Sequence, residues 1–227
     1  MLSDCFFDCS RLYDTPPPDE LLSFYKNNRI KISGVYTSFY SDVESIPVCI
    51  RRIKKQCMSK TAAYRETSKA KVAPVVYLTP DLILNPDFVR LSVVYKNYSY
   101  IFLELPYTLE LDWLTSALHS IVFSMKLLPV FVRFERYAII YPEYIVKKLL
   151  SVPKASYIFS MSFIDAKRSR QLFSSMVKDN LPVYVGSASL EFERIKKFYA
   201  DSQREIKDLL GTTDAALYEL RHNSFLG

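Results

Sequence analysis

Short apolar runs alternate along the chain with longer segments in which apolar residues recur at helical spacing. The runs that predict strands are Cys5–Cys9, Ile30–Thr37, Val72–Leu78, Ser99–Leu105, Pro129–Phe134, Ser156–Met161 and Pro182–Val185. The segments that predict helices are Pro18–Asn27, Ile46–Lys69, Leu109–Lys126, Pro142–Ser151, Asp165–Lys178, Leu190–Leu210 and Asp214–Arg221. Strands that alternate with helices are typical of βα units and a mainly parallel sheet. About seven strands, each followed by a helix, predict an α/β fold, namely one distorted (β/α)7 TIM-like barrel.

Several element boundaries have local chemical reasons. Asp165 is suited to cap a helix N-terminus, because its carboxylate can accept from the free amides of the first turn. Pro142 suits a first helical turn, and Gly211 suits the end of the long helix near the C-terminus. The run Leu91–Tyr95 and the apolar run after it predict a hairpin, in which Asn97 would take a positive φ.

The composition is that of a packed globular protein. The chain has 227 residues and no linker rich in Pro, Gly or Ser, so residues 1–227 are expected to form a single domain. Only 4 of the residues are glycine, and the glycine-rich loops that bind phosphate are absent from the sequence. This argues against a nucleotide-binding enzyme.

The charge and the cysteine content limit the partners and the cellular compartment that we expect for the protein. The formal charge of +6 permits an anionic partner without requiring nucleic acid, which we do not expect as a partner. The four cysteines, Cys5, Cys9, Cys49 and Cys57, form no CxxC pair and are expected to be free thiols. Asp4 and Asp8 interrupt the apolar N-terminus, and Lys126 interrupts the longest apolar region. We therefore expect a cytoplasmic protein without a secretory signal or transmembrane segment.

Barrels of this kind carry their active sites at the C-terminal ends of the strands. The residues at these ends are Asp8, Thr37, Glu104, Arg133, Met161 and Ser187. Candidate functional residues are therefore sought at these positions first.

Short motifs at these strand ends follow one another in the order and spacing of a known family. Leu103–Pro106 is similar to its "ELP" motif, and Pro129 to Tyr137 to its "PVLAHPERY". Val76–Leu82 is similar to "EIYLDPDLL", Asp4–Asp14 to "DIHCHILPGID", Thr37–Phe39 to "TPH", and Gly186–Ser189 to "SDAH", with Arg194 at the place of a later arginine. Over nearly its whole length the chain thus resembles the PHP-family tyrosine phosphatases of the capsule-biosynthesis type. The resemblance implies a seven-stranded barrel that binds several divalent metals and hydrolyses phosphotyrosine on a bacterial tyrosine kinase.

Most of the metal ligands that the resemblance implies are replaced in this chain. Phe6 and Asp8 stand at the two histidines of the first motif, and Phe39, Arg133, Ser187 and Ser189 stand at further ligand positions. The remnant oxygen ligands are Asp8, Asp14 and Glu104. The chain has only 2 histidines, His119 and His222, which cannot supply a cluster that needs five or more. We therefore expect no cofactor, with Mn or Fe at reduced occupancy as the alternative.

Arginine at position 133 changes the expected chemistry of the pocket. A guanidinium is always charged and cannot bind a metal, so Arg133 would repel a cation and could pair with Glu104. Phe6 and Phe39 would fill the vacated volume with apolar surface. Two interpretations remain open, namely drift after loss of catalysis and a pocket adapted to bind an anion.

Three arginines, Arg133, Arg136 and Arg194, are candidates for that anion site, since guanidinium groups match phosphate oxygens in pairs. The alternative is that Arg136 pairs with Glu104 or Glu135 as internal scaffolding. The basic helix around Arg51 and Arg52 is expected to be a solvated face, with acidic lipids or an acidic kinase tail as the alternative.

The function expected from the sequence is a non-catalytic PHP-type pseudophosphatase with a binding or regulatory role. Its setting would be the control of tyrosine phosphorylation in capsule or exopolysaccharide production, with a bacterial tyrosine kinase or phosphotyrosine peptide as partner. The alternatives are a residual metal-dependent protein-tyrosine phosphatase and a purely structural subunit, and a homo-oligomer is left open.

Overall fold

The computed structural model of the chain describes residues 7–8, 19–28, 34–65, 71–108, 112–187 and 192–222. It contains an eight-stranded sheet in the order β1-β2-β3-β5-β6-β7-β8, with β4 paired to β5 outside this path. The strands are β1 (Phe7–Asp8), β2 (Gly34–Phe39), β3 (Lys71–Tyr77), β4 (Val93–Tyr95), β5 (Tyr98–Glu104), β6 (Leu128–Val132), β7 (Ser156–Ser160) and β8 (Val183–Gly186). All neighbours along the path are parallel, and β4 runs antiparallel to β5. The mainly parallel α/β sheet expected from the sequence is therefore confirmed.

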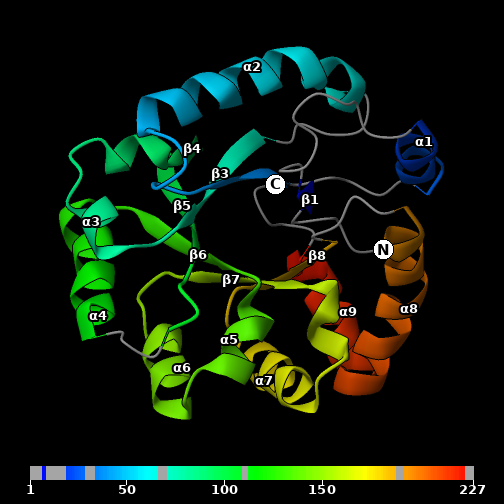
Figure 1. Cartoon of the computed structure of the whole chain (residues 1–227). Coiled ribbons are helices and arrows are strands. Elements are labelled where there is room, and N and C mark those ends of the chain that lie inside the picture. The colour runs from blue at the N-terminus through cyan, green and yellow to red at the C-terminus, as the bar shows by residue number, and fades with distance from the viewer. Residues whose placement is uncertain are drawn as a thin grey trace.

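Helices surround the curled sheet, which forms a half-barrel in the described part of the chain (Figure 1). The α-helices are α1 (Asp19–Asn27), α2 (Ile46–Arg65), α3 (Pro80–Ile83), α4 (Asp112–His119), α5 (Phe134–Ile140), α6 (Glu143–Leu150), α7 (Lys167–Lys178), α8 (Phe192–Leu210) and α9 (Thr212–His222). Shorter turns are the 3-10 helices η1 (Phe88–Leu91) and η3 (Met161–Ile164) and the π-helix η2 (Ser120–Ser124). No helix among the described residues is long and apolar enough to span a membrane.

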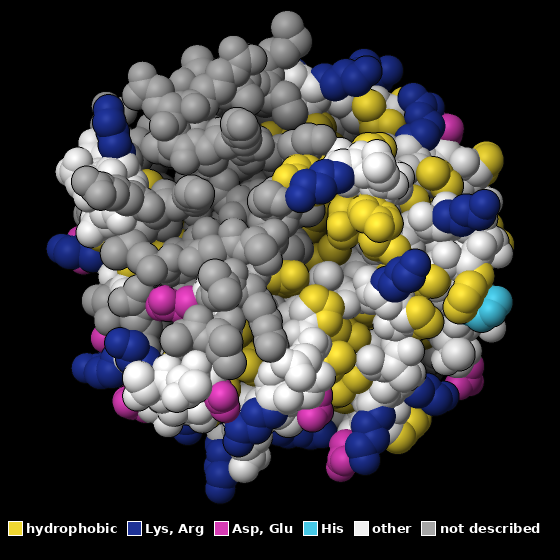
Figure 2. Space-filling model, turned by 180° about the vertical axis from the view of Figure 1, so that it is seen from behind, with side chains coloured by type: hydrophobic (Ala, Val, Ile, Leu, Met, Phe, Trp, Pro, Cys, Tyr) yellow, Lys and Arg dark blue, Asp and Glu magenta, His cyan; other side chains and the backbone are white. Residues whose placement is uncertain are grey.

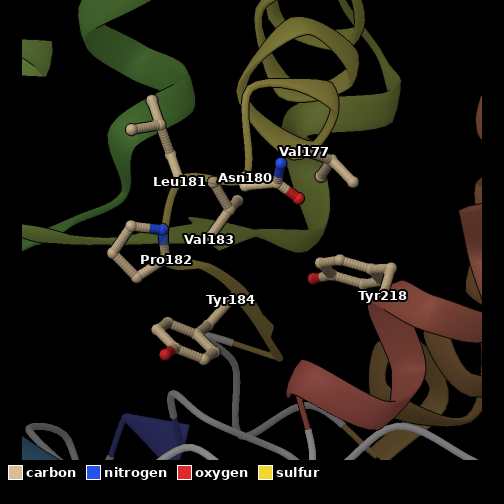
Figure 3. A pocket seen from close by; sticks show the side chains of 7 residues that line it. All are labelled: Val177, Asn180, Leu181, Pro182, Val183, Tyr184 and Tyr218. Carbon is tan, nitrogen blue, oxygen red and sulfur yellow. The ribbon is translucent and has the colours of Figure 1, made fainter.

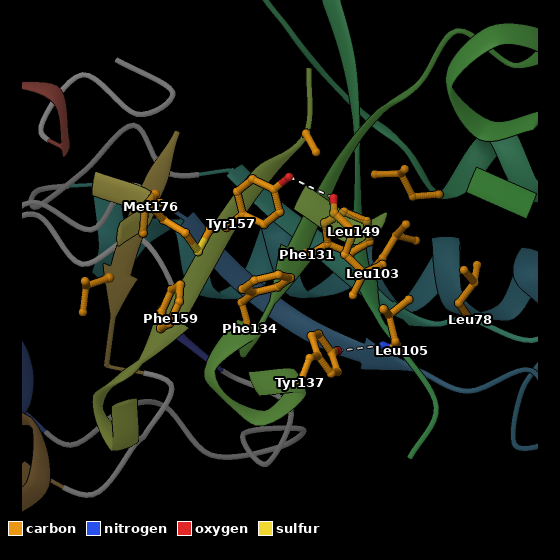
Figure 4. Packing of buried hydrophobic residues seen from close by; sticks show 14 of the residues in the cluster. Leu78, Leu103, Leu105, Phe131, Phe134, Tyr137, Leu149, Tyr157, Phe159 and Met176 are labelled. Carbon is orange, nitrogen blue, oxygen red and sulfur yellow. Dashed lines mark hydrogen bonds between the residues drawn. The ribbon is translucent and has the colours of Figure 1, made fainter. Parts of the chain in front are cut away.

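The side chains of the strands divide between two cores, because successive residues of a strand point to opposite faces. The outer core lies between the sheet and the helices. In Figure 4, for example, Leu103, Phe131 and Tyr157 pack together, and the Tyr157 hydroxyl donates to the Leu149 carbonyl at 3.0 Å. The inner core consists of strand residues from the concave face, namely Tyr36, Ala73, Val75, Phe102, Val130, Val132 and Ile158. Glu104 follows Phe102 by two residues and so lies on this concave face, at the C-terminal mouth of the half-barrel.

Several local expectations need correction. Asp165 is not the N-cap of α7, because that place is held by Ala166, whose side chain cannot cap. Pro142 is itself the N-cap of α6 and does not lie in its first turn. The hairpin is confirmed, but the positive φ of 52° falls on Lys96 and not on Asn97. Gly211 is confirmed at the end of α8, with a φ of 80° and a hydrogen bond of 2.8 Å from its amide to the Lys207 carbonyl.

The helix α5 was not predicted from the sequence, in which the apolar run through Phe134 indicated a continuous strand. The strand β6 ends at Val132 and α5 begins at Phe134, so one residue makes the whole turn. That residue is Arg133, which adopts left-handed backbone angles (φ 54°, ψ 44°). A turn this short has no run of Gly, Pro or Asn to announce it in the sequence.

Candidate functional site

The C-terminal mouth of the half-barrel brings together Glu104 from the end of β5 and Arg133 from the turn after β6. Nη1 of Arg133 donates to both carboxylate oxygens of Glu104, at 3.0 Å to Oε2 and 3.2 Å to Oε1. Glu104 is buried, and the side chain of Arg133 is only 14% exposed. The pairing of Arg133 with Glu104 that the sequence suggested is confirmed.

The backbone of Arg133 is unusual for a residue with a side chain. The left-handed conformation costs an L-residue roughly 1–2 kcal/mol relative to the right-handed one. Such conformations persist where surrounding contacts determine them, and they gather at functional sites. Here the turn aims the Arg133 guanidinium back across the strand ends at Glu104.

A second guanidinium reaches the same carboxylate from outside. Nη1 of Arg136, on α5, donates to Glu104 Oε1 at 3.2 Å and also hydrogen-bonds the hydroxyl of Tyr107. That hydroxyl donates in turn to Glu104 Oε1 at 2.7 Å, and the guanidinium carbon lies 5.9 Å from the centre of the Tyr107 ring. Burial, followed by the hydrogen bond and charge of Glu104, raises the pKa of Tyr107, so the hydroxyl stays protonated and can donate.

The charges of this cluster leave an excess of positive charge. Two guanidinium groups share one carboxylate, so Arg133, Arg136 and Glu104 together carry a net charge of +1. The side chain of Arg136 is 43% exposed, and both of the side-chain hydrogen bonds described above leave from Nη1. Its Nε and Nη2 donors therefore have no acceptor in the part of the chain that the structure describes. A group with two anionic oxygens is the natural ligand for such a guanidinium edge.

Glu135 is a buried carboxylate that the sequence analysis considered only as a partner of Arg136. It accepts from the Ser160 amide at 2.9 Å and from the Ser160 hydroxyl, and the Ser169 hydroxyl donates to its carbonyl at 3.1 Å. Burial is the main cause that raises the pKa of Glu135, although the Ser160 donors and Arg136 oppose it. The hydrogen bonds of Glu135 with Ser160 therefore connect α5, which carries Arg136, to the end of β7.

A further cluster at the end of β2 was not foreseen. Arg52, on α2, donates to the buried Thr37 hydroxyl at 2.5 Å, to the Ser38 carbonyl at 3.1 Å and to the Glu44 carboxylate. Its side chain is 15% exposed, so it does not belong to the solvated basic face that the sequence suggested. Nearby, burial and then the charge of Glu44 raise the pKa of Cys49 to about 12, as expected for a buried free thiol.

The structure describes some of the remaining candidate residues in full, and others only through their backbone or not at all. Phe39 is fully buried, as expected, and His119 is exposed on α4 with its ring against Phe123. Asp8 pairs with Tyr36 through the backbone, and Arg194 lies in α8, but their side chains are outside what the structure describes. Phe6, Asp14 and Ser189 also lie outside the described residues.

The opposite end of β8 carries a separate cavity of about 360 Å³. It is lined by Val177, Asn180, Leu181, Pro182, Val183, Tyr184 and Tyr218 (Figure 3). On the face that Figure 2 shows, Lys and Arg side chains are scattered among apolar and polar ones and do not form a stripe. The cavity lies at the start of β8 and so away from the arginine cluster at the strand C-termini.

The described residues around Glu104 do not fit a metal cluster. Both carboxylate oxygens already accept from cationic or hydroxyl donors, and a permanent positive charge lies 3.0 Å away. Within the described ranges, no group of three or more His, Cys, Asp or Glu is placed to hold a metal ion.

Comparison with known proteins adds evidence for the fold. No family model matches the sequence, and no curated protein matches it. The fold is similar to a structure from the work described as "Crystal structures of YwqE from Bacillus subtilis and CpsB from Streptococcus pneumoniae, unique metal-dependent tyrosine phosphatases". The TM-score is 0.64 at 12% identity, over 91% of this chain and 85% of that chain. The chain therefore has the fold of the PHP-family tyrosine phosphatases, as its motifs suggested.

The same match corrects one expectation. The sequence analysis expected no cofactor, yet the protein with the similar fold is described as metal-dependent. The expectation of no cofactor is therefore wrong on this comparison.

Proposed function

We propose that the protein is a phosphatase-like protein of PHP type that binds a phosphorylated partner at the C-terminal mouth of its sheet. In this proposal the half-barrel is part of a closed (β/α)7 barrel in a single domain over residues 1–227. The observation that carries it is the convergence of Arg133 and Arg136 on one buried carboxylate, with donors of Arg136 left for a ligand. Arg194, on α8, would be a third contact.

The proposed ligand is a phosphotyrosine side chain of a bacterial tyrosine kinase or a peptide from it. Support comes from the fold match to proteins described as tyrosine phosphatases, and from the exposed Tyr107 ring beside Arg136. An aromatic phosphate could place its ring against Tyr107 while its oxygens meet the guanidinium edge. The role would be regulatory, in the control of capsule or exopolysaccharide production, and binding rather than turnover would be the main activity.

The test is a calorimetric titration of the intact protein with phosphotyrosine and phenyl phosphate at low salt. Binding is expected, and Arg136→Ala should weaken it at least tenfold, because a charge-assisted hydrogen bond contributes about 1.5–3 kcal/mol. The matched control is Arg204→Ala, which removes an exposed arginine of α8 that, like Arg136, pairs with a carboxylate. Undetectable binding by the wild type would refute the proposal.

The second candidate is a metal-dependent tyrosine phosphatase, which the description of the fold match favours. Under this function Glu104 would be a ligand, and Asp8 and Asp14 would be further ones. Hydrolysis of a phosphotyrosine peptide would then appear on loading with Mn or Fe and disappear in Glu104→Gln. Such turnover would replace the binding function with this one.

A further inference from the structure

The helix α5 presents three side chains to solvent. Arg136 is 43% exposed, Ile139 is 55% exposed and Ile140 is 39% exposed. The remaining residues of the helix, Phe134, Glu135, Tyr137 and Ala138, are buried. Figure 4 shows Phe134 and Tyr137 directed into the packed core.

Helical geometry sets the arginine between the two isoleucines. Successive residues of an α-helix turn by about 100° and rise by about 1.5 Å. Relative to Arg136, Ile139 is therefore turned by about 60° to one side and Ile140 by about 40° to the other, some 4.5–6 Å along the axis. Arg136, whose guanidinium binds Glu104, thus projects from an apolar part of the helix surface. The half-exposed Tyr107 ring lies beside its guanidinium group.

Exposed apolar side chains that adjoin a proposed ligand site can take part in binding the ligand's neighbours. We propose that the outer face of α5 is a docking surface for a partner segment whose phosphorylated side chain is flanked by apolar residues. The anion would meet Arg136, and the flanking side chains would cover Ile139 and Ile140. This inference rests on the proposed function and adds to it a preference for the sequence around the phosphate.

A second copy of the chain suits this surface less well. In a two-fold dimer the same patch meets itself, so the interface would contain two Arg136 guanidinium groups. The like charges would repel in the region where apolar contact excludes water. A partner that carries an anion between apolar side chains complements both the charge and the apolar area.

The test compares two phosphotyrosine peptides that differ only in having leucine or serine on both sides of the phosphorylated residue. Fluorescence anisotropy with the full chain should show about tenfold tighter binding of the leucine peptide, or about 1.4 kcal/mol. Ile139→Ser and Ile140→Ser should each reduce this preference severalfold, because they weaken binding of the leucine peptide more than binding of the serine peptide. Val94→Ser is the matched control, since Val94 is 57% exposed on β4 and pairs with Ser99, near the start of β5.

The outcomes separate this inference from the proposed function. Equal binding of the two peptides, or a leucine preference that both isoleucine variants retain, would overturn the inference and leave the phosphate site intact. Failure of both peptides to bind would overturn the two proposals together. A dimer in sedimentation velocity that Ile139→Ser dissociates would assign the surface to a second copy and so overturn the inference as well.

Discussion

Replacing Glu104 by glutamine should strengthen the binding of a phosphorylated ligand. In the proposed site Glu104 is an internal anion that competes for the arginines, because it accepts from Arg133 and Arg136. Glutamine keeps the shape and one acceptor oxygen but removes the charge. The change therefore leaves a net charge of +2 where the native cluster has +1.

The magnitude follows from the geometry. Since Glu104 Oε1 is 3.2 Å from Nη1 of Arg136, a phosphoryl oxygen on Nη2 would lie about 6 Å from the carboxylate. Two unit charges at that distance repel by about 3 kcal/mol at an effective dielectric constant of about 20. Arg136 is 43% exposed, so screening reduces the gain to about 1–2 kcal/mol, or roughly tenfold in Kd.

Calorimetric titration of Glu104→Gln with phenyl phosphate measures this gain, and Glu104→Asp serves as the variant that keeps the charge. Glu143→Gln is a second control, because Glu143 forms an exposed pair with Lys147 on α6. Urea unfolding should confirm that Glu104→Gln is folded, with a loss of about 1.5–3 kcal/mol for the weakened charge-assisted hydrogen bonds from Arg133. Equal or weaker binding by the folded variant would refute the competing-anion argument.

Two further predictions concern groups that support the site. Burial raises the pKa of Glu135 in the folded protein. The contribution of this carboxyl to the free energy of unfolding is therefore complete below the carboxyl pKa of the unfolded chain, and it is lost as pH rises through the pKa of the folded protein. Glu135→Gln should therefore gain unfolding free energy relative to the wild type as pH rises above the ordinary carboxyl pKa of about 4.3. A difference between the two proteins that stays constant with pH in urea titrations would contradict this. Arg52→Met should destabilise the fold by about 2–4 kcal/mol, because it leaves Glu44 without this partner. Arg204→Met, at an exposed pair, should cost under about 1 kcal/mol, and equal losses in thermal unfolding would count against a structural role of Arg52.

The sequence predicted the alternating strands and helices because each strand is apolar over most of its length. It also predicted the Glu104–Arg133 pair, since both residues follow strands whose C-terminal ends must meet at one edge of a parallel sheet. It missed α5, because the single left-handed residue Arg133 makes the turn without the usual turn residues. It also misjudged Arg52, whose inward direction depends on tertiary hydrogen bonds to Thr37 and Ser38 and not on local composition.

The most direct measurement is a crystal structure of the full chain with phosphotyrosine bound. The account predicts phosphoryl oxygens within hydrogen-bonding distance of Nε or Nη2 of Arg136, with the ligand ring beside Tyr107. Phosphotyrosine bound elsewhere, or held by metal ions that Glu104 coordinates, would contradict the claim that the arginine pair is the phosphate site.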